Sequence, residues 1–202
     1  TGKTSSLLAL RDYLNNQRKY YCLYINVEDA QAARENIHNG INSIVENIDI
    51  QVNMNMQWFN DKFLDIKKKC EDITPESKLN KILNLICLSL DKPLILFIDE
   101  IDSLIGDTLI SVLRQLRSGY TNRPKGFPQT VVLCGVRDVQ DYRIHSSKEK
   151  TIITGGSAFN IKAKSIRLGN FDKDDIKKLY LEHTNETGQK FEYDVYDYVW
   201  EL

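Results

Sequence analysis

Continuous hydrophobic runs alternate with helically spaced apolar positions along the chain, and together they predict a layered α/β fold. Short apolar or β-branched runs are typical of buried parallel strands. Such runs lie at residues 20–27, 94–98, 130–136 and 165–168. Helical patterns separate them, which favours a mostly parallel sheet covered by helices.

Helices are predicted in the segments between these strands. Residues 5–15 carry Leu7, Leu10 and Leu14 on one face, and residues 28–91 are mostly helical. The clearest helix of that stretch begins after the N-cap residue Thr74, with Pro75 in first position. Further helices are predicted after the cap residues Asp107 and Asp172 and from about residue 193, and residues 138–163 are expected to form an irregular loop.

Two carboxylates follow the strand at 94–98. Open α/β sheets bind ligands at the carboxyl ends of their strands, and Asp99 and Glu100 lie there. Asp99 could hold Mg²⁺ through water, and Glu100 could orient or deprotonate a water that attacks a γ-phosphate. An isolated acidic pair can equally solvate a strand end or cap a turn, so these two residues alone leave both interpretations open.

The opening residues match the end of a phosphate-binding loop, G-x-x-x-x-G-K-[ST]. Gly2, Lys3, Thr4 and Ser5 begin a helix, where free N–H groups and the helix dipole suit phosphate. Lys3 would reach the β- and γ-phosphates, and the Thr4 hydroxyl would take a Mg²⁺ position. The tripeptide is common by chance, but an acidic strand about 95 residues later, after a strand-and-helix unit, favours nucleotide binding.

These two stretches carry a family resemblance. Gly2-Lys3-Thr4 resembles the end of a Walker A motif, and "LILFIDEID" resembles a Walker B motif of the AAA+ type. The chain resembles P-loop ATPases of the additional-strand, catalytic-glutamate division, and among them bacterial AAA-like and STAND-type ATPases. The resemblance implies a three-layer P-loop core at 1–169, cut within the Walker A motif and lacking its first strand, and the beginning of a helical lid at 170–202.

The resemblance also implies a chemistry. ATP and Mg²⁺ would be the cofactors, Glu100, Lys3 and Arg137 the catalytic residues, and hydrolysis would drive a conformational switch. Arg137 would sense the γ-phosphate, because it follows the apolar strand in "VVLCGVRD". The chain has no Asn at the end of that strand, unlike most ring-forming AAA+ motors.

A strand order follows from the resembled fold. The strand at 20–27 is expected at one edge, then 94–98, then 131–136, all parallel, with a vacancy before 165–168. The N–H groups of Gly2, Lys3 and Thr4 should lie next to the carboxylates of Asp99 and Glu100. Because half of the loop is expected to be absent, this fragment is expected to bind ATP poorly.

Composition and charge limit the classes of partner that the chain is expected to bind. The chain has 202 residues and a net charge of −1, so it has no global basic field for nucleic acid or an anionic membrane. No apolar stretch reaches the ~20 residues of a membrane span. The scattered cysteines Cys22, Cys70, Cys87 and Cys134 suggest buried thiols in a reducing compartment.

The resulting expectation is a cytoplasmic ATPase without membrane contact, with a protein partner or output domain in the full-length chain. Two alternatives stay open. One is a nucleotide-binding scaffold that does not hydrolyse, and the other is a DNA-associated AAA+ module.

Overall fold

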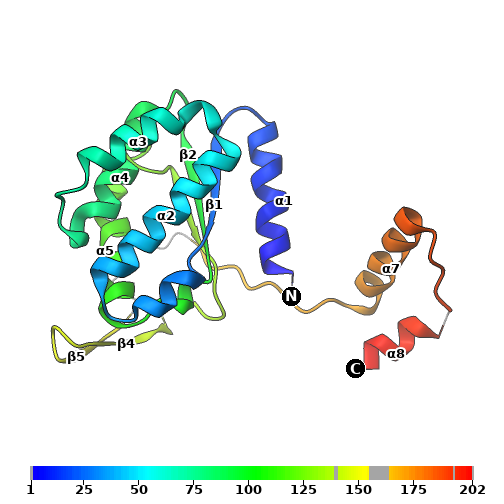
Figure 1. Ribbon diagram of the computed structural model, residues 1–202. Helices are drawn as coiled ribbons and strands as arrows, with labels where there is room; N and C mark the ends of the chain where they lie inside the picture. Colours follow the sequence, from blue (N-terminus) through cyan, green and yellow to red (C-terminus); the bar gives the residue numbers. More distant parts are fainter. Residues whose placement is uncertain (1, 139–140, 155–163, 193, 202) are drawn as a thin grey trace. The chain divides into compact units, whose positions relative to one another are not determined.

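The computed structural model describes residues 2–138, 141–154, 164–192 and 194–201 (Figure 1). The chain divides into two compact units. The larger unit is Thr4–Ser165, and the smaller unit combines Thr1–Lys3 with Ile166–Leu202. Each unit is described by itself below.

A three-stranded parallel sheet forms the centre of the larger unit. Its strands are β1 (Tyr21–Asn26), β2 (Leu94–Asp99) and β3 (Thr130–Leu133), in the order β1-β2-β3. Tyr21 pairs with Leu94 and Asn26 with Asp99, so β1 and β2 run side by side to their ends. The α/β class, the parallel direction and the order of these three strands are confirmed, although β3 ends earlier than predicted.

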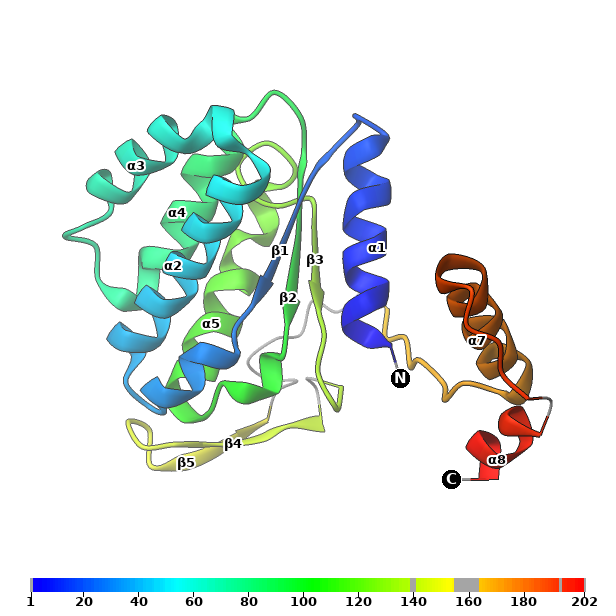
Figure 2. The same ribbon diagram turned by 45° about the vertical axis from the view of Figure 1, so that its right-hand side comes forward.

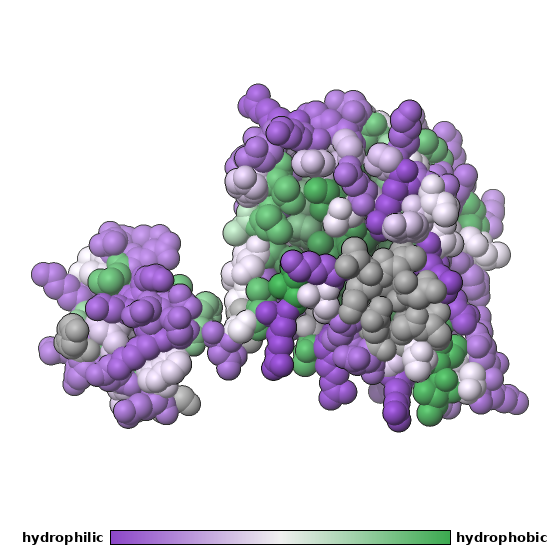
Figure 3. All heavy atoms as spheres, turned by 180° about the vertical axis from the view of Figure 1, so that it is seen from behind, coloured by the Kyte–Doolittle hydropathy of each residue, from purple (hydrophilic) through white to green (hydrophobic). Residues whose placement is uncertain are grey.

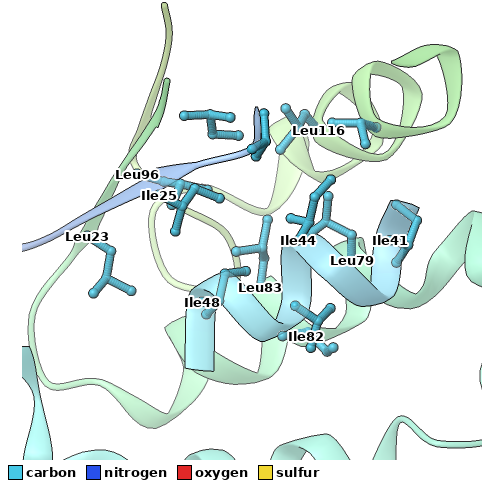
Figure 4. Packing of buried hydrophobic residues seen from close by; sticks show 14 of the residues in the cluster. Leu23, Ile25, Ile41, Ile44, Ile48, Leu79, Ile82, Leu83, Leu96 and Leu116 are labelled. Carbon is cyan, nitrogen blue, oxygen red and sulfur yellow. The ribbon is translucent and has the colours of Figure 1, made fainter. Parts of the chain in front are cut away.

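Helices cover one face of this sheet and bury most of the core. They are α2 (Ile37–Asn55), α3 (Asn60–Lys69), α4 (Pro75–Ser89) and α5 (Gly106–Ser118). Leu23, Ile25 and Leu96 face them, and α2 contributes isoleucines at helical spacing (Figure 4). Short 3-10 helices join these elements, namely η1 (Glu28–Ala33), η2 (Gln57–Phe59), η3 (Ile101–Ser103) and η4 (Gly119–Asn122).

Helix α1 (Lys3–Asn16) covers the opposite face, so the larger unit has three layers (Figure 2). Beneath it lie Cys22, Tyr24, Ile95 and Phe97, the buried side chains of the alternate strand positions. Leu7 and Leu14 pack on them as predicted, whereas Leu10 is 44% exposed. This layer therefore consists of α1, whereas the layer on the other face contains α2, α3, α4 and α5.

The free edge of β3 lies at the position where the expected strand order has its vacancy. Within the described residues no strand pairs with this edge, and Val131, Val132 and Leu133 are only half-buried. Figure 3 shows apolar side chains gathered on this side of the larger unit. Unpaired backbone groups and apolar side chains thus lie along one edge of the sheet.

A hairpin replaces part of the loop predicted at 138–163. Strands β4 (Arg143–Ser146) and β5 (Thr151–Thr154) are antiparallel, and Ile144 pairs with Ile153. Both isoleucines are buried in the main core. The expectation of an irregular loop was wrong there because each strand has only four residues and a single clearly core-facing isoleucine. Residues 139–140 and 155–163 lie outside the described residues.

Asp107 anchors this hairpin and does not cap α5. The helix begins at Gly106 with Ile105 before it, so the predicted capping role of Asp107 is wrong. The Asp107 carboxylate is buried and accepts hydrogen bonds from Ser146 Oγ at 2.6 Å and from the Lys148 N–H at 3.0 Å. Donors on the hairpin, distant in sequence, therefore bind the side chain that the local pattern assigned to the helix start.

We expect Asp107→Ala to lower the free energy of unfolding by about 1–2 kcal/mol, because the buried Ser146 hydroxyl and the part-buried Lys148 N–H lose their acceptor. Urea denaturation followed by circular dichroism measures this change. Glu149→Ala is the matched control, since it removes an exposed ion pair between the same hairpin and Arg114. It should cost less than about 0.5 kcal/mol. Equal losses in both variants would contradict an anchoring role for Asp107.

Within its described residues, the smaller unit contains the helices α7 (Lys173–Thr187) and α8 (Val195–Glu201). Asp172 caps α7 as predicted, in a capping box with Asp175. The helices meet through Tyr180, whose ring contacts those of Phe191 and Tyr196 at 4.6 Å and 5.8 Å between centroids.

The strand predicted at 165–168 is wrong. Residues 164–171 adopt no regular structure, and Ile166 and Leu168 are 72% and 45% exposed. Two apolar side chains in a four-residue run match the pattern of a strand, but they bury no surface that would stabilise one. Across both units, no helix in the described residues is long and apolar enough to cross a membrane.

Candidate functional site

Strand β2 places Asp99 at the carboxyl end of the sheet, in its middle strand. Every residue of β2 is buried, and Asp99 is 1% exposed. Its Oδ2 accepts hydrogen bonds from Thr4 Oγ1 at 2.7 Å and from the Tyr24 hydroxyl at 2.9 Å. Its Oδ1 accepts one from the Glu100 N–H at 3.0 Å. The chain thus satisfies a buried carboxylate that would otherwise be costly.

These donors keep Asp99 ionised. Burial by itself raises the pKa of Asp99, but hydrogen bonds from Thr4, Cys134, Tyr24 and the Glu100 N–H outweigh it and lower the pKa below its usual value. Conversely, burial together with the hydrogen bond and charge of Asp99 raises the pKa of Tyr24 to about 12. Near neutral pH, Tyr24 is therefore a neutral donor to a charged acceptor.

Helix α1 begins at the end of the sheet where β1, β2 and β3 stop (Figures 1 and 2). Thr4 and Ser5 lie in its first turn, which has no acidic side chain and presents N–H groups without intrahelical partners. The hydrogen bond from Thr4 joins this helix start to Asp99 across 95 residues of sequence. Gly2 and Lys3 are grouped with the smaller unit, so this arrangement rests on Thr4 and Ser5.

Glu100 has an unusual backbone conformation. Its φ of 56° lies in the left-handed region, which is uncommon for a residue with a β-carbon. Such strain is often found at functional positions. The side chain is half-buried, and within the described residues its carboxylate accepts no hydrogen bond. The carboxylate is therefore available to a water or a ligand beside Asp99.

Arg137 follows β3 at the same end of the sheet. The Ile101 N–H donates to the Cys134 carbonyl at 3.0 Å, and the Val136 N–H to Asp102 Oδ1 at 3.3 Å. These bonds tie the segment that leads to Arg137 to the segment after β2. The Arg137 side chain itself is exposed, and its predicted contact with a γ-phosphate stays a prediction.

Sequence reasoning missed Tyr24 at this site. It lies within "YYCLYINV", where an aromatic residue indicates only a buried strand. The available signal was strand alternation, which puts Cys22, Tyr24 and Asn26 on one face of β1 beside the end of β2. Asn26 caps the loop after β1, since its Oδ1 accepts from the Glu28 N–H at 2.8 Å.

The side chains that could ligate a metal here suit magnesium better than a transition metal. The described residues contain no group of three or more His, Cys, Asp or Glu side chains that could form a protein-only metal site. A hydroxyl and a carboxylate are the hard oxygen ligands that Mg²⁺ prefers, and Mg²⁺ commonly keeps waters and substrate phosphates as its other ligands. Thr4 and Asp99 therefore fit a magnesium ion that arrives with a phosphate compound.

Comparison of the chain with protein-family models, with curated proteins and with solved structures found no match.

Proposed function

We propose that this chain is the nucleotide-binding core of a P-loop ATPase of the AAA-like or STAND type. The observation that supports this most is the 2.7 Å hydrogen bond from Thr4 to Asp99. In P-loop NTPases the Ser or Thr that follows the loop lysine and an Asp at the end of a buried strand hold Mg²⁺. Thr4 follows Lys3 at a helix start, and Asp99 ends β2.

Each residue then has a chemical role in cleaving ATP. Lys3 and the N–H groups of the first turn of α1 would bind the phosphates. The Thr4 hydroxyl donates a hydrogen bond to Asp99, which leaves the Thr4 oxygen lone pairs free for a cation. Bound Mg²⁺ would neutralise phosphate charge, held by Thr4 and Asp99.

Glu100 would act as the general base in this reaction. It accepts a proton from a water as the water oxygen bonds to the γ-phosphorus. The bond from that phosphorus to the bridging oxygen breaks, which yields ADP and inorganic phosphate. Arg137 would contact the γ-phosphate and signal its loss.

The same proposal covers the organisation of the chain. Residues 1–169 would form the P-loop core, and residues 170–202 the beginning of a helical lid. Hydrolysis would switch the conformation of a cytoplasmic protein that acts on a protein partner or an output domain.

Lys3→Ala tests the proposal. In the full-length protein we expect it to weaken ATP binding at least about tenfold, or about 1.4 kcal/mol, because an ammonium group on the phosphates is lost. Titration calorimetry with ATP and with GTP, with and without Mg²⁺, measures the change. Lys19→Ala, at an exposed lysine just beyond the other end of α1, is the control. Wild-type affinity in Lys3→Ala would show that the opening tripeptide is not a phosphate loop.

A further inference from the structure

The Tyr24 hydroxyl lies inside the candidate site, although the proposed chemistry assigns it no role. Tyr24 comes from the middle of β1 and is 8% exposed. Its hydroxyl donates at 2.9 Å to Asp99 Oδ2, the same oxygen that Thr4 Oγ1 contacts at 2.7 Å. Tyr24 and Thr4 thus share one carboxylate oxygen.

This sharing fills the acceptor capacity of Oδ2. A carboxylate oxygen has about two lone-pair sites. Thr4 and Tyr24 take both sites of Oδ2, and the Glu100 N–H donates to Oδ1. A metal-bound water that donates to Oδ2 must therefore displace Thr4 or Tyr24.

Tyr24 is the donor whose release would open the oxygen nearest to Thr4. Thr4 itself is required there by the proposed function, and the Glu100 N–H is fixed by the backbone on the other oxygen. The Asn26 side chain donates to the Tyr24 hydroxyl oxygen, because this contact lowers the pKa of Tyr24. That oxygen would keep its donor after the hydroxyl leaves Asp99, and the hydroxyl proton would then need a new acceptor such as water.

We propose that Tyr24 is a positioning residue that restrains metal binding. Its hydroxyl holds Asp99 in place and occupies the acceptor position on Oδ2 that a metal-bound water needs. Loading of a metal–nucleotide complex then requires the hydrogen bond between Tyr24 and Asp99 to break. This inference rests on the proposed function, since it concerns the same magnesium and nucleotide.

Tyr24→Phe tests the inference, with Tyr21→Phe as its matched control. Tyr21 begins the same strand, and its hydroxyl also donates to an aspartate, Asp91 Oδ1 at 2.9 Å, away from the site. The probe is Mn²⁺, whose affinity for the full-length protein with bound ATP analogue is measured by electron paramagnetic resonance. Metal-free binding of the same analogue and the melting temperature are measured in parallel.

We expect Tyr24→Phe to bind Mn²⁺ about three- to tenfold more tightly, because one competing hydrogen bond is removed. Metal-free affinity for the analogue should stay within about twofold, and Tyr21→Phe should leave both affinities unchanged. A merely structural role of Tyr24 would lower the melting temperature without tightening Mn²⁺ binding. Tyr24→Met serves as a second variant without the hydroxyl if Tyr24→Phe folds poorly.

If the wild type binds the analogue but the Tyr24 variants bind Mn²⁺ with unchanged or weaker affinity, the inference about Tyr24 is overturned and the proposed function is not. A wild type that binds neither the analogue nor Mn²⁺ would overturn the proposed function as well, so the two failures are distinguishable.

Discussion

Glu100→Gln is expected to leave nucleotide binding near the wild-type level and to lower ATP turnover by a factor of about 100 or more. Glutamine keeps the shape of the side chain but cannot take a proton from water. Glu100 directly follows Asp99, adopts a left-handed backbone conformation, and has a carboxylate free of protein donors within the described residues. These features fit a base that acts on water beside the phosphates.

Phosphate release at saturating ATP measures the turnover, and equilibrium titration measures the binding. Glu28→Gln is the matched control, because Glu28 follows β1 much as Glu100 follows β2 but is exposed. Turnover near the wild-type rate in Glu100→Gln would exclude Glu100 as the base. A wild type that binds ATP without turnover would favour the non-hydrolysing scaffold.

Asp99→Asn is expected to lower the free energy of unfolding by about 2–4 kcal/mol and to abolish the Mg²⁺-dependent part of nucleotide affinity. All the groups that contact the Asp99 carboxylate are donors, namely Thr4, Tyr24, the Glu100 N–H and the Cys134 thiol. The amide nitrogen of asparagine must face at least one of them in a buried position. Where the amide nitrogen faces the Glu100 N–H, two donors oppose each other without an acceptor. Where it faces Thr4 and Tyr24, their hydroxyls must turn to accept from it, and their own protons lose an acceptor.

Urea denaturation at several pH values measures this effect. Because folding lowers the pKa of Asp99, its charge stabilises the wild type fully above the unfolded-state pKa of about 4. That stabilisation is lost as pH falls through the lowered folded-state pKa, so the gap between wild type and variant should narrow in acid. Asp102→Asn, which affects one longer bond to the Val136 N–H, should cost less than about 1 kcal/mol. A constant gap across the acid range would contradict the role given to the Asp99 charge.

The strands β1 and β2 of the central sheet were predictable from the sequence because they are buried on both faces. β1 and β2 are continuous apolar runs, and periodicity is informative when nearly every side chain of an element is buried. Their order required the resemblance, since hydrophobic pattern alone does not say which parallel strands are neighbours. The proximity of Thr4 to Asp99 was likewise predicted from the resemblance and not from the hydrophobic pattern.

The errors occurred where long-range contacts override the local pattern. Asp107 looks like a helix cap, but donors from Ser146 and Lys148 in the hairpin bind it. Tyr24 looks like a core residue, and only the register of β1 against β2 shows that its hydroxyl reaches Asp99. The run at 165–168 looks like a strand, but it lacks a buried partner surface. For Asp107 and Tyr24 the deciding contact partner is distant in sequence.

The pairing of β1 with β2 across the whole α2–α4 crossover has a consequence for the order of folding. The chain must close a long loop before these parallel strands can meet, and the entropy of that closure slows their pairing. The helices of the crossover form from local contacts, whereas Asp99 meets Thr4 only when the ends of the crossover are together. The candidate site is therefore assembled late, and a chain that has lost its chemistry can still retain most of its helices.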